Sequence, residues 1–215
     1  MGQMDLIYLS RGDMDYPATL PVYLADQSPA RIAALGNLEI LRERKLALFC
    51  SVKCPGDLIL KTYDVARALR DAGVTVIGGF HSPMEKECLA LLLRGRQPVI
   101  ICPARGLEAM RLPVEWKKPL DERRLLLISP FEEKDRRVTA RLATKRNEFV
   151  VALADEILVA YAEAGGKTER FCRKTLEWRK PLLMFESKEH EDLLAAGAEV
   201  TSVEGLTEEW KRAQS

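Results

Sequence analysis

Apolar residues follow two patterns along this chain. Short continuous apolar runs, such as "LALFCS" and "PVIIC", are typical of strands that are buried on both faces of a sheet. Between them lie longer segments with apolar residues at helical spacing, several of which end at a glycine. The runs predict strands at 46–51, 74–78, 98–102, 124–129, 156–161 and 181–185. The spaced segments predict helices over 56–73, 82–95, 136–154 and 167–179.

Strands that alternate with helices predict right-handed crossovers and a parallel sheet. The predicted fold class is therefore α/β, a doubly wound, mostly parallel Rossmann-like sheet with helices on both faces. We expect an N-terminal helical prelude over 1–42, the Rossmann-like domain over 43–186, and an acidic C-terminal tail over 187–215 packed on that domain. Ligands of such sheets bind beyond the carboxyl ends of the strands. The loops expected there are 51–57, 79–83, 102–107, 129–136 and 162–168.

The composition is that of a soluble globular protein, with 47% hydrophobic and 30% charged residues. No apolar run is long enough to span a membrane, and the N-terminus lacks a basic start followed by an apolar core. We therefore expect a cytoplasmic protein with no membrane contact and reduced, buried cysteines. Cys50 and Cys54 are spaced CxxxC with no second pair and no nearby histidine, so we expect neither a metal nor a cofactor.

The formal net charge of +1 hides an uneven distribution. Lys134 to Arg146 carries six basic residues and one acid, and Lys167 to Lys180 carries six basic residues and two acids. From Glu186 onward there are eight acids and three bases. A solvated helix face explains any single charge run, but two basic runs that flank one predicted strand favour a basic patch at one edge of the sheet.

The turn after the strand at 156–161 contains paired glycines. Gly166, Lys167 and Thr168 match the end of the phosphate-binding pattern GxxxxGK[ST], but Tyr161 stands where its first glycine is required. Backbone amides at Gly165 and Gly166, the start of a helix and the Lys167 ammonium would nevertheless suit an anion. The alternative is a tight turn that needs glycine only for its backbone conformation.

A second glycine-rich turn, "IGGFHSPME", follows the strand at 74–78. Gly78 and Gly79 would permit close approach of a ligand to the backbone, and His81 would lie at the rim. Ser82 is expected to cap the next helix, with Glu85 completing a capping box. For His81, an ordinary surface or hydrogen-bonded role is the alternative to a functional one.

Two arginines complete the candidate rim. Arg105 and Gly106 fall on the loop after the third strand, and Arg146 and Asn147 precede the apolar run of the fifth. A guanidinium suits phosphate, and an asparagine can bridge backbone or base groups. We expect Arg146 to be a charged ligand near Gly166 and Lys167, unless it pairs with a surface acid such as Glu148 or Asp155.

The order of these stretches resembles the DprA/Smf family of DNA-processing proteins, within the Rossmann-like group that includes the LOG proteins. The motifs that carry the resemblance are "YPATL" at 16–20, "LGN" at 35–37 and "RNEFVVALADEILVAYAEAGGKT" from Arg146 to Thr168. Where the family's first strand ends in Gly-Ser-Arg, this chain has Cys50, Ser51 and Val52, with Lys53 next. The chain is thus similar to a divergent, single-domain member, with Ser51 and Lys53 as candidate ligand-binding residues.

The resemblance implies binding of single-stranded DNA and its transfer to a recombinase during uptake of foreign DNA, and it leaves a homodimer open. A small-nucleotide binder or sensor is the second hypothesis. The third is a LOG-type enzyme that hydrolyses the N-glycosidic bond of a nucleoside monophosphate, for which "AGGKTE" provides Glu169 in place of the PGGxGTxxE glutamate. Glu169 and His81 are the catalytic candidates in that case only.

Overall fold

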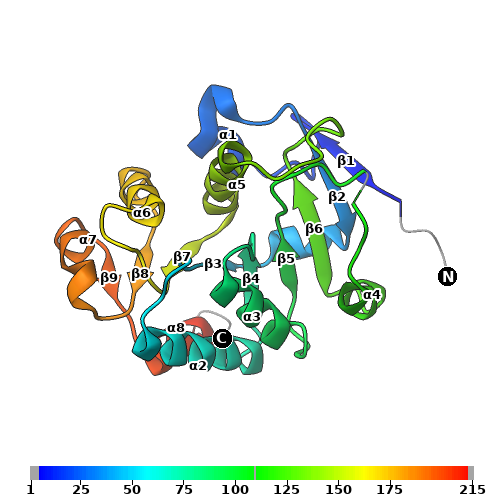
Figure 1. Cartoon of the computed structure of the whole chain (residues 1–215). Helices are drawn as coiled ribbons and strands as arrows, with labels where there is room; N and C mark the ends of the chain where they lie inside the picture. The colour runs from blue at the N-terminus through cyan, green and yellow to red at the C-terminus, as the bar shows by residue number, and fades with distance from the viewer. Residues whose placement is uncertain (1–4, 109, 213–215) are drawn as a thin grey trace.

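The computed structural model describes residues 5–108 and 110–212. Within them the chain forms one nine-stranded sheet with the order β1-β2-β6-β5-β4-β3-β7-β8-β9 (Figure 1). The strands are β1 Ile7–Ser10, β2 Arg31–Gly36, β3 Lys45–Phe49, β4 Thr75–Gly78, β5 Val99–Ile101, β6 Leu125–Ser129, β7 Glu156–Val159, β8 Leu182–Met184 and β9 Glu199–Val200. The helices are α1 Thr19–Leu24, α2 Gly56–Asp71, α3 Pro83–Leu92, α4 Val114–Asp121, α5 Ala140–Leu153, α6 Lys167–Glu177, α7 Glu191–Ala195 and α8 Val203–Arg212, with 3-10 turns η1 Ala25–Gln27, η2 Leu38–Arg42 and η3 Lys188–His190.

The six predicted strands are confirmed, and β3 to β9 all pair in parallel. Because the sheet is covered on both sides, successive residues of one strand enter different cores. Leu46 and Leu48 of β3 face one core, whereas Ala47 and Phe49 face the other. This double burial is why the strands read as continuous apolar runs.

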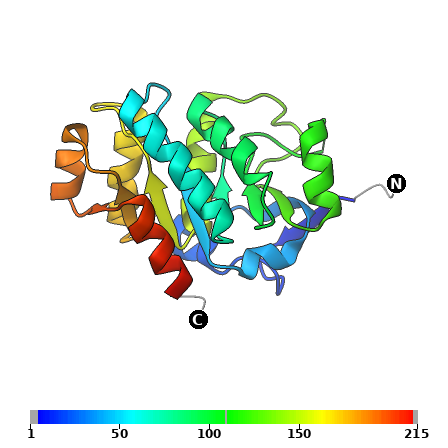
Figure 2. The same cartoon turned by 90° about the horizontal axis from the view of Figure 1, so that it is seen from below.

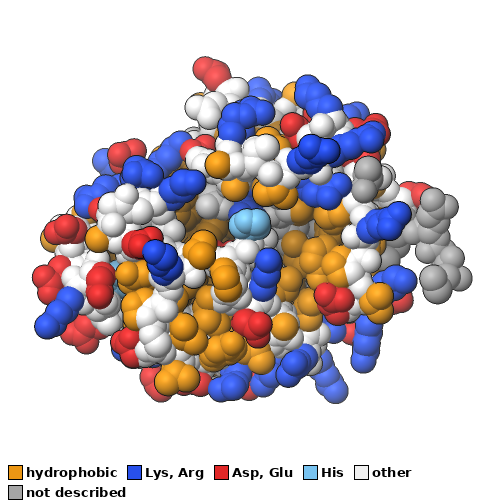
Figure 3. Space-filling view, viewed as in Figure 1, with side chains coloured by type: hydrophobic (Ala, Val, Ile, Leu, Met, Phe, Trp, Pro, Cys, Tyr) orange, Lys and Arg blue, Asp and Glu red, His pale blue; other side chains and the backbone are white. Residues whose placement is uncertain are grey.

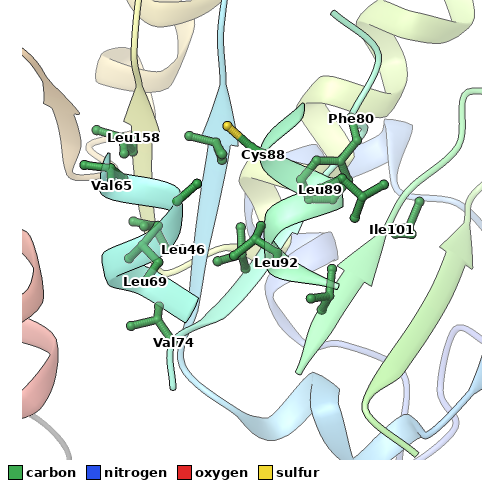
Figure 4. Packing of buried hydrophobic residues seen from close by; sticks show 14 of the residues in the cluster. Leu46, Val65, Leu69, Val74, Phe80, Cys88, Leu89, Leu92, Ile101 and Leu158 are labelled. Carbon is green, nitrogen blue, oxygen red and sulfur yellow. The ribbon is translucent and has the colours of Figure 1, made fainter. Parts of the chain in front are cut away.

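The two cores lie under different sets of helices. Figure 2 shows α2, α3, α4 and α8 across one face of the sheet, and Figure 1 shows α1, α5, α6 and α7 beyond the other. In the first core, Val65 and Leu69 of α2 and Leu92 of α3 pack on Leu46 of β3 and its neighbours (Figure 4). The predicted α/β fold with helices on both faces is therefore confirmed.

The N-terminal segment is not the helical prelude that the sequence analysis predicted over 1–42. It contains β1 and β2, which pair antiparallel with each other, and β2 continues the sheet by pairing antiparallel with β6. The buried run Ile32 to Leu35 is apolar on both faces, as in the central strands. The run "RIAALG" has the same buried-strand pattern as the other runs and could have predicted β2.

Helix starts follow local capping chemistry. Ser82 caps α3 and Glu85 completes the predicted capping box. The helix predicted over 136–154 begins later, at Ala140, because the Thr139 hydroxyl accepts a hydrogen bond from the Leu142 amide and ends the preceding extended segment.

Helix α8 returns to the amino-terminal end of β7. The indole of Trp210 in α8 is buried and donates a hydrogen bond of 3.1 Å to the Glu156 carboxylate. Arg44 stacks over the same indole and also pairs with Glu156. Among the described residues, no helix has both the length and the apolar character needed to cross a bilayer.

Gly36 provides a test of how β2 joins the sheet. It has a φ of +116°, and a Cβ there would lie 2.3 Å from the Leu125 carbonyl oxygen of the neighbouring strand. We expect Gly36→Ala to lower the free energy of unfolding by roughly 2–4 kcal/mol, from backbone strain and overpacking together. Urea denaturation measures this loss.

Gly12→Ala is the matched control, because Gly12 has a φ of +106° but nothing within 4 Å of its added Cβ. It should lose only the strain of about 1 kcal/mol. Equal losses in the two variants would show that the contact between β2 and β6 is looser than described.

Candidate functional site

The candidate site lies where the chain reverses its direction across the sheet. From β3 the strands proceed outward through β4, β5 and β6, and β7 then returns to the other side of β3. Such a reversal leaves a crevice at the carboxyl ends of the strands. Here the crevice is a cleft of about 860 Å³, which we call the switch-point cleft. Figure 3 shows a hollow in this face of the molecule, with Lys and Arg side chains gathered above it.

Four segments line the switch-point cleft. They are the end of β3 with its loop, the loop from β4 into α3, the first half of α5 with the two residues before it, and the first turns of α6. The predicted site residues that line it are Ser51, His81, Ser82, Arg146, Asn147, Lys167 and Thr168. The sequence analysis therefore placed residues from all four segments on one site.

Arg146 is a buried anchor, whereas the sequence predicted a charged ligand on the rim. Its side chain is only 4% exposed. The guanidinium donates hydrogen bonds to the Cys102 carbonyl oxygen at 3.1 Å and to the Asn147 side-chain oxygen at 2.7 Å. Burial lowers the pKa of Arg146, and the nearby Glu85 carboxylate opposes that shift. The alternative partners are paired elsewhere, Glu148 with Lys174 and Asp155 with Lys45. The hydrogen bond to Cys102 joins α5 to the loop after β5.

Gly79 is glycine because the Arg146 guanidinium lies against it. A Cβ on Gly79 would be 1.4 Å from the Arg146 Nη1 atom. A Cβ on Gly78 would be 3.1 Å from the ring of Phe80, which has a φ of +46°. The close approach expected at these glycines is thus made by the protein's own side chains.

Glu85 fills the amino end of α3. Its carboxylate accepts hydrogen bonds from the backbone amides of Cys50 at 3.0 Å, His81 at 2.7 Å and Ser82 at 3.3 Å. A carboxylate therefore already occupies the place where the helix dipole would attract an anion. The same carboxylate balances the buried charge of Arg146. The imidazole of His81 remains exposed at the mouth of the cleft.

Two backbone amides of the turn before α6 already have hydrogen-bond acceptors in the protein. The Gly165 amide, at a φ of +68°, donates to Glu169 at 2.5 Å, and the Gly166 amide donates to the Glu163 carbonyl oxygen at 2.9 Å. These two predicted phosphate-binding amides are therefore occupied. Arg173 also pairs with Glu169, and this hydrogen bond lowers the pKa of the Glu169 carboxyl.

The amino end of α6 still offers an anion site. Gly166 makes no side-chain cap, and the amides of Lys167 and Thr168 donate to no acceptor among the described residues. Both residues line the cleft. The helix is 11 residues long and begins at Lys167. The positive end of its dipole and the Lys167 ammonium would therefore attract an anion to the same place.

Two further cations of α6 were missed by the sequence analysis. Arg170 and Lys174 line the cleft beside Lys167. Lys174 is paired with Glu148 at 2.6 Å, whereas Arg170 donates to the Gly165 carbonyl oxygen and helps to lower the pKa of Glu169. Their spacing from Lys167, at i+3 and i+7, places all three on one helix face and could have revealed them.

Other predicted residues support loops instead of lining the cleft. The Arg105 carbonyl oxygen accepts from the Ser129 hydroxyl at 2.7 Å, and the Gly106 amide donates to the Asp135 carbonyl oxygen at 3.0 Å. Lys53 is exposed on the first rim loop, outside the cleft lining. Ser51 does line the cleft, and its hydroxyl accepts from the Glu163 amide at 3.1 Å, which ties the loop after β3 to the loop after β7.

The described residues contain no cluster of metal-ligating side chains. No group of three His, Cys, Asp or Glu side chains there could hold an ion. The five cysteines are free thiols. Burial raises the pKa of Cys88, Cys102 and Cys172 to about 12, so these thiols are poor nucleophiles.

A sequence model of the family described as DNA recombination-mediator protein A matches residues 7–210. The chain belongs to this family. The resemblance predicted from the motifs is therefore confirmed. No curated protein matches the sequence.

Solved structures of this family share the fold. DNA processing protein A from Streptococcus pneumoniae matches with a TM-score of 0.78 and 19% identity, over 95% of this chain and 74% of that one. The protein of the same name from Helicobacter pylori, described for its unique single-stranded DNA binding mode, gives 0.77 and 18%, over 98% and 97%. A molybdenum cofactor binding protein from Rippkaea orientalis is more distant, at 0.57 and 12%, over 81% and 99%.

The contact between Gly79 and Arg146 can be measured with a double-mutant cycle. We expect Gly79→Ala to destabilise the protein by roughly 1–3 kcal/mol, because the added methyl group displaces a buried guanidinium. In an Arg146→Ala background the same change should have little effect, since all three close atoms belong to Arg146. Chemical denaturation of the four proteins gives the coupling energy.

Gly56→Ala is the control, because its added Cβ meets nothing within 4 Å. A loss at Gly79 that persists at full size without the arginine would contradict the anchoring role of Arg146.

Proposed function

We propose that the switch-point cleft binds single-stranded DNA, with a phosphate of the strand at the amino end of α6. The observation that carries this proposal is the pair of unbonded amides at Lys167 and Thr168 beside the cationic side chains of Lys167 and Arg170, neither of which forms an ion pair. Backbone amides, a helix dipole and two positive side chains together favour a phosphate over a neutral ligand.

The charge balance of the cleft supports the same point of contact. Glu148 offsets Lys174, and Glu85 offsets the buried Arg146. Among the described residues that line the cleft, Lys167 and Arg170 form no ion pair, although Arg170 lies near enough to Glu169 to help lower the pKa of that carboxyl. The net positive charge is therefore concentrated at the start of α6.

The remaining lining suits nucleobases. Val52 and Val138 are 71% and 47% exposed and both line the cleft, as does Phe171 of α6. Phe171 packs edge-on against Phe49, with 4.6 Å between the ring centroids, and this contact holds the Phe171 ring in place. An apolar surface beside a phosphate site fits a ligand with an unstacked base, and sequence-independent binders of single strands combine these two features.

The family's description as a recombination mediator extends the proposal to a partner. A protein that binds a single strand in a cleft open to solvent can hand that strand to a recombinase. A homodimer remains an expectation from the resemblance. The LOG-type reaction receives no support from Glu169, whose carboxylate is held by Arg173 and the Gly165 amide.

Fluorescence anisotropy with a labelled oligothymidylate tests the proposal. We expect the double variant Lys167→Gln/Arg170→Gln to bind the strand roughly 10- to 100-fold more weakly, because it removes charge-assisted contacts with phosphate. The slope of log affinity against log salt should flatten by about 1.4, which is two single-strand phosphate contacts.

The control is Arg94→Gln/Arg96→Gln, which removes two exposed cations from the turn before β5, at the opposite edge of the sheet. It should bind as the wild type does. Equal weakening in both variants would mean that only net charge matters, and tighter binding of mononucleotides than of the oligonucleotide would favour the small-nucleotide hypothesis instead.

A further inference from the structure

A second hollow, lined by charged side chains of both signs, lies on the other flank of α5. It has a volume of about 310 Å³ and is bounded by α5, the segment from Leu24 to Pro29 and the loop 130–135. We call it the outer hollow. Its cations are Lys134, Arg141 and Lys145, its acids are Glu132, Asp135 and Glu148, and it also includes Phe131. The basic run from Lys134 to Arg146 contains all three cations, and the proposed contact at α6 does not use them.

The two hollows share α5 as a common wall. Ala140, Ala143 and Thr144 line the switch-point cleft, whereas Arg141 and Lys145 line the outer hollow. Glu148 lines both hollows. Only the width of one helix therefore separates them.

Two of the three cations in the outer hollow form no ion pair. Lys134 is paired with Glu132 at 2.7 Å, whereas Arg141 and Lys145 form no ion pair with Asp135, Glu148 or any other acid in the part of the chain that the structure describes. Glu148, the acid nearest to them along the helix, is held by Lys174 from the side of the cleft. The ion pair between Lys174 and Glu148 therefore leaves the two α5 cations free for another anion.

The spacing of these cations suits a polyanion. Arg141 and Lys145 are one helical turn apart, a rise of about 6 Å along α5. This is close to the separation of neighbouring phosphates in an extended strand. The exposed Arg137 precedes them, beside the positive end of the helix, and lines an open groove together with Arg141.

We propose that the outer hollow is a second subsite for the same single strand, which crosses α5 and places successive phosphates on Arg141 and Lys145. This inference rests on the proposed function of the switch-point cleft and extends its footprint. The occupant is a phosphodiester backbone, because the hollow offers unpaired cations at a repeated spacing. Phe131 is only 8% exposed and provides a floor, not a stacking surface.

The length of the bound strand separates the two sites. We would measure the affinity of labelled oligothymidylates of roughly 4 and roughly 16 nucleotides, the range of site sizes among single-strand binders. The variant Arg141→Gln/Lys145→Gln should bind the short strand within about twofold of the wild type. It should bind the long strand at least tenfold more weakly, with a salt slope flatter by about 1.4.

Two further variants make the outcome decisive. Lys167→Gln/Arg170→Gln should weaken both lengths, and Arg94→Gln/Arg96→Gln should weaken neither. Glutamine preserves helix propensity, and thermal unfolding checks that each variant is folded. An equal loss for both lengths in the α5 variant would place its cations in the first site and overturn the subsite.

Normal binding of both lengths by the α5 variant would also overturn it, and would leave these cations for an acidic protein surface. A wild-type protein that binds neither length would remove the proposed function itself, and the subsite with it. A wild type that binds both lengths equally well would retain the proposed function and reject the subsite alone.

Discussion

The buried guanidinium of Arg146 is the interaction on which the rim of this sheet depends. It comes from α5, lies against Gly79 after β4 and donates to the Cys102 carbonyl oxygen after β5. Three segments from separate parts of the chain therefore share one side chain. A buried arginine is tolerated only when its hydrogen bonds and its charge are satisfied, and Glu85 supplies the opposing charge. The position of α5, and with it one wall of the cleft, follows from this arrangement.

The same arrangement decides where a ligand can bind. Two glycine-rich turns lead from strands into helices, and each could accept an anion at the helix start. Glu85 fills the first from within, whereas the second keeps the amides of Lys167 and Thr168 available. In the proposed function, the internal carboxylate therefore leaves the start of α6 as the place for an external phosphate.

The sequence predicted what depends on local pattern. Continuous apolar runs identified six strands correctly, and Ser82 with Glu85 predicted the start of α3. The N-terminal strands were missed although β2 carries the same pattern, because an antiparallel addition at the edge of a sheet is not announced by an intervening helix. Gly79 was predicted to be a place where a ligand approaches the backbone, whereas the group that lies against it is the Arg146 guanidinium. Nothing local distinguishes a ligand from a side chain that arrives from a distant helix.

Charge runs have the same limitation. The basic run that ends at Arg146 appears in sequence as one patch, yet the turn of α5 distributes it among three environments. Arg146 is buried, Arg141 and Lys145 line the outer hollow, and Lys134 is neutralised by Glu132. Among the described residues that line the cleft, Lys167 and Arg170 are the cations assigned to the proposed phosphate contact, and so few contacts would give it a modest electrostatic affinity. A strand that must be passed on benefits from several such weak contacts, because each can be released separately while the others still hold it.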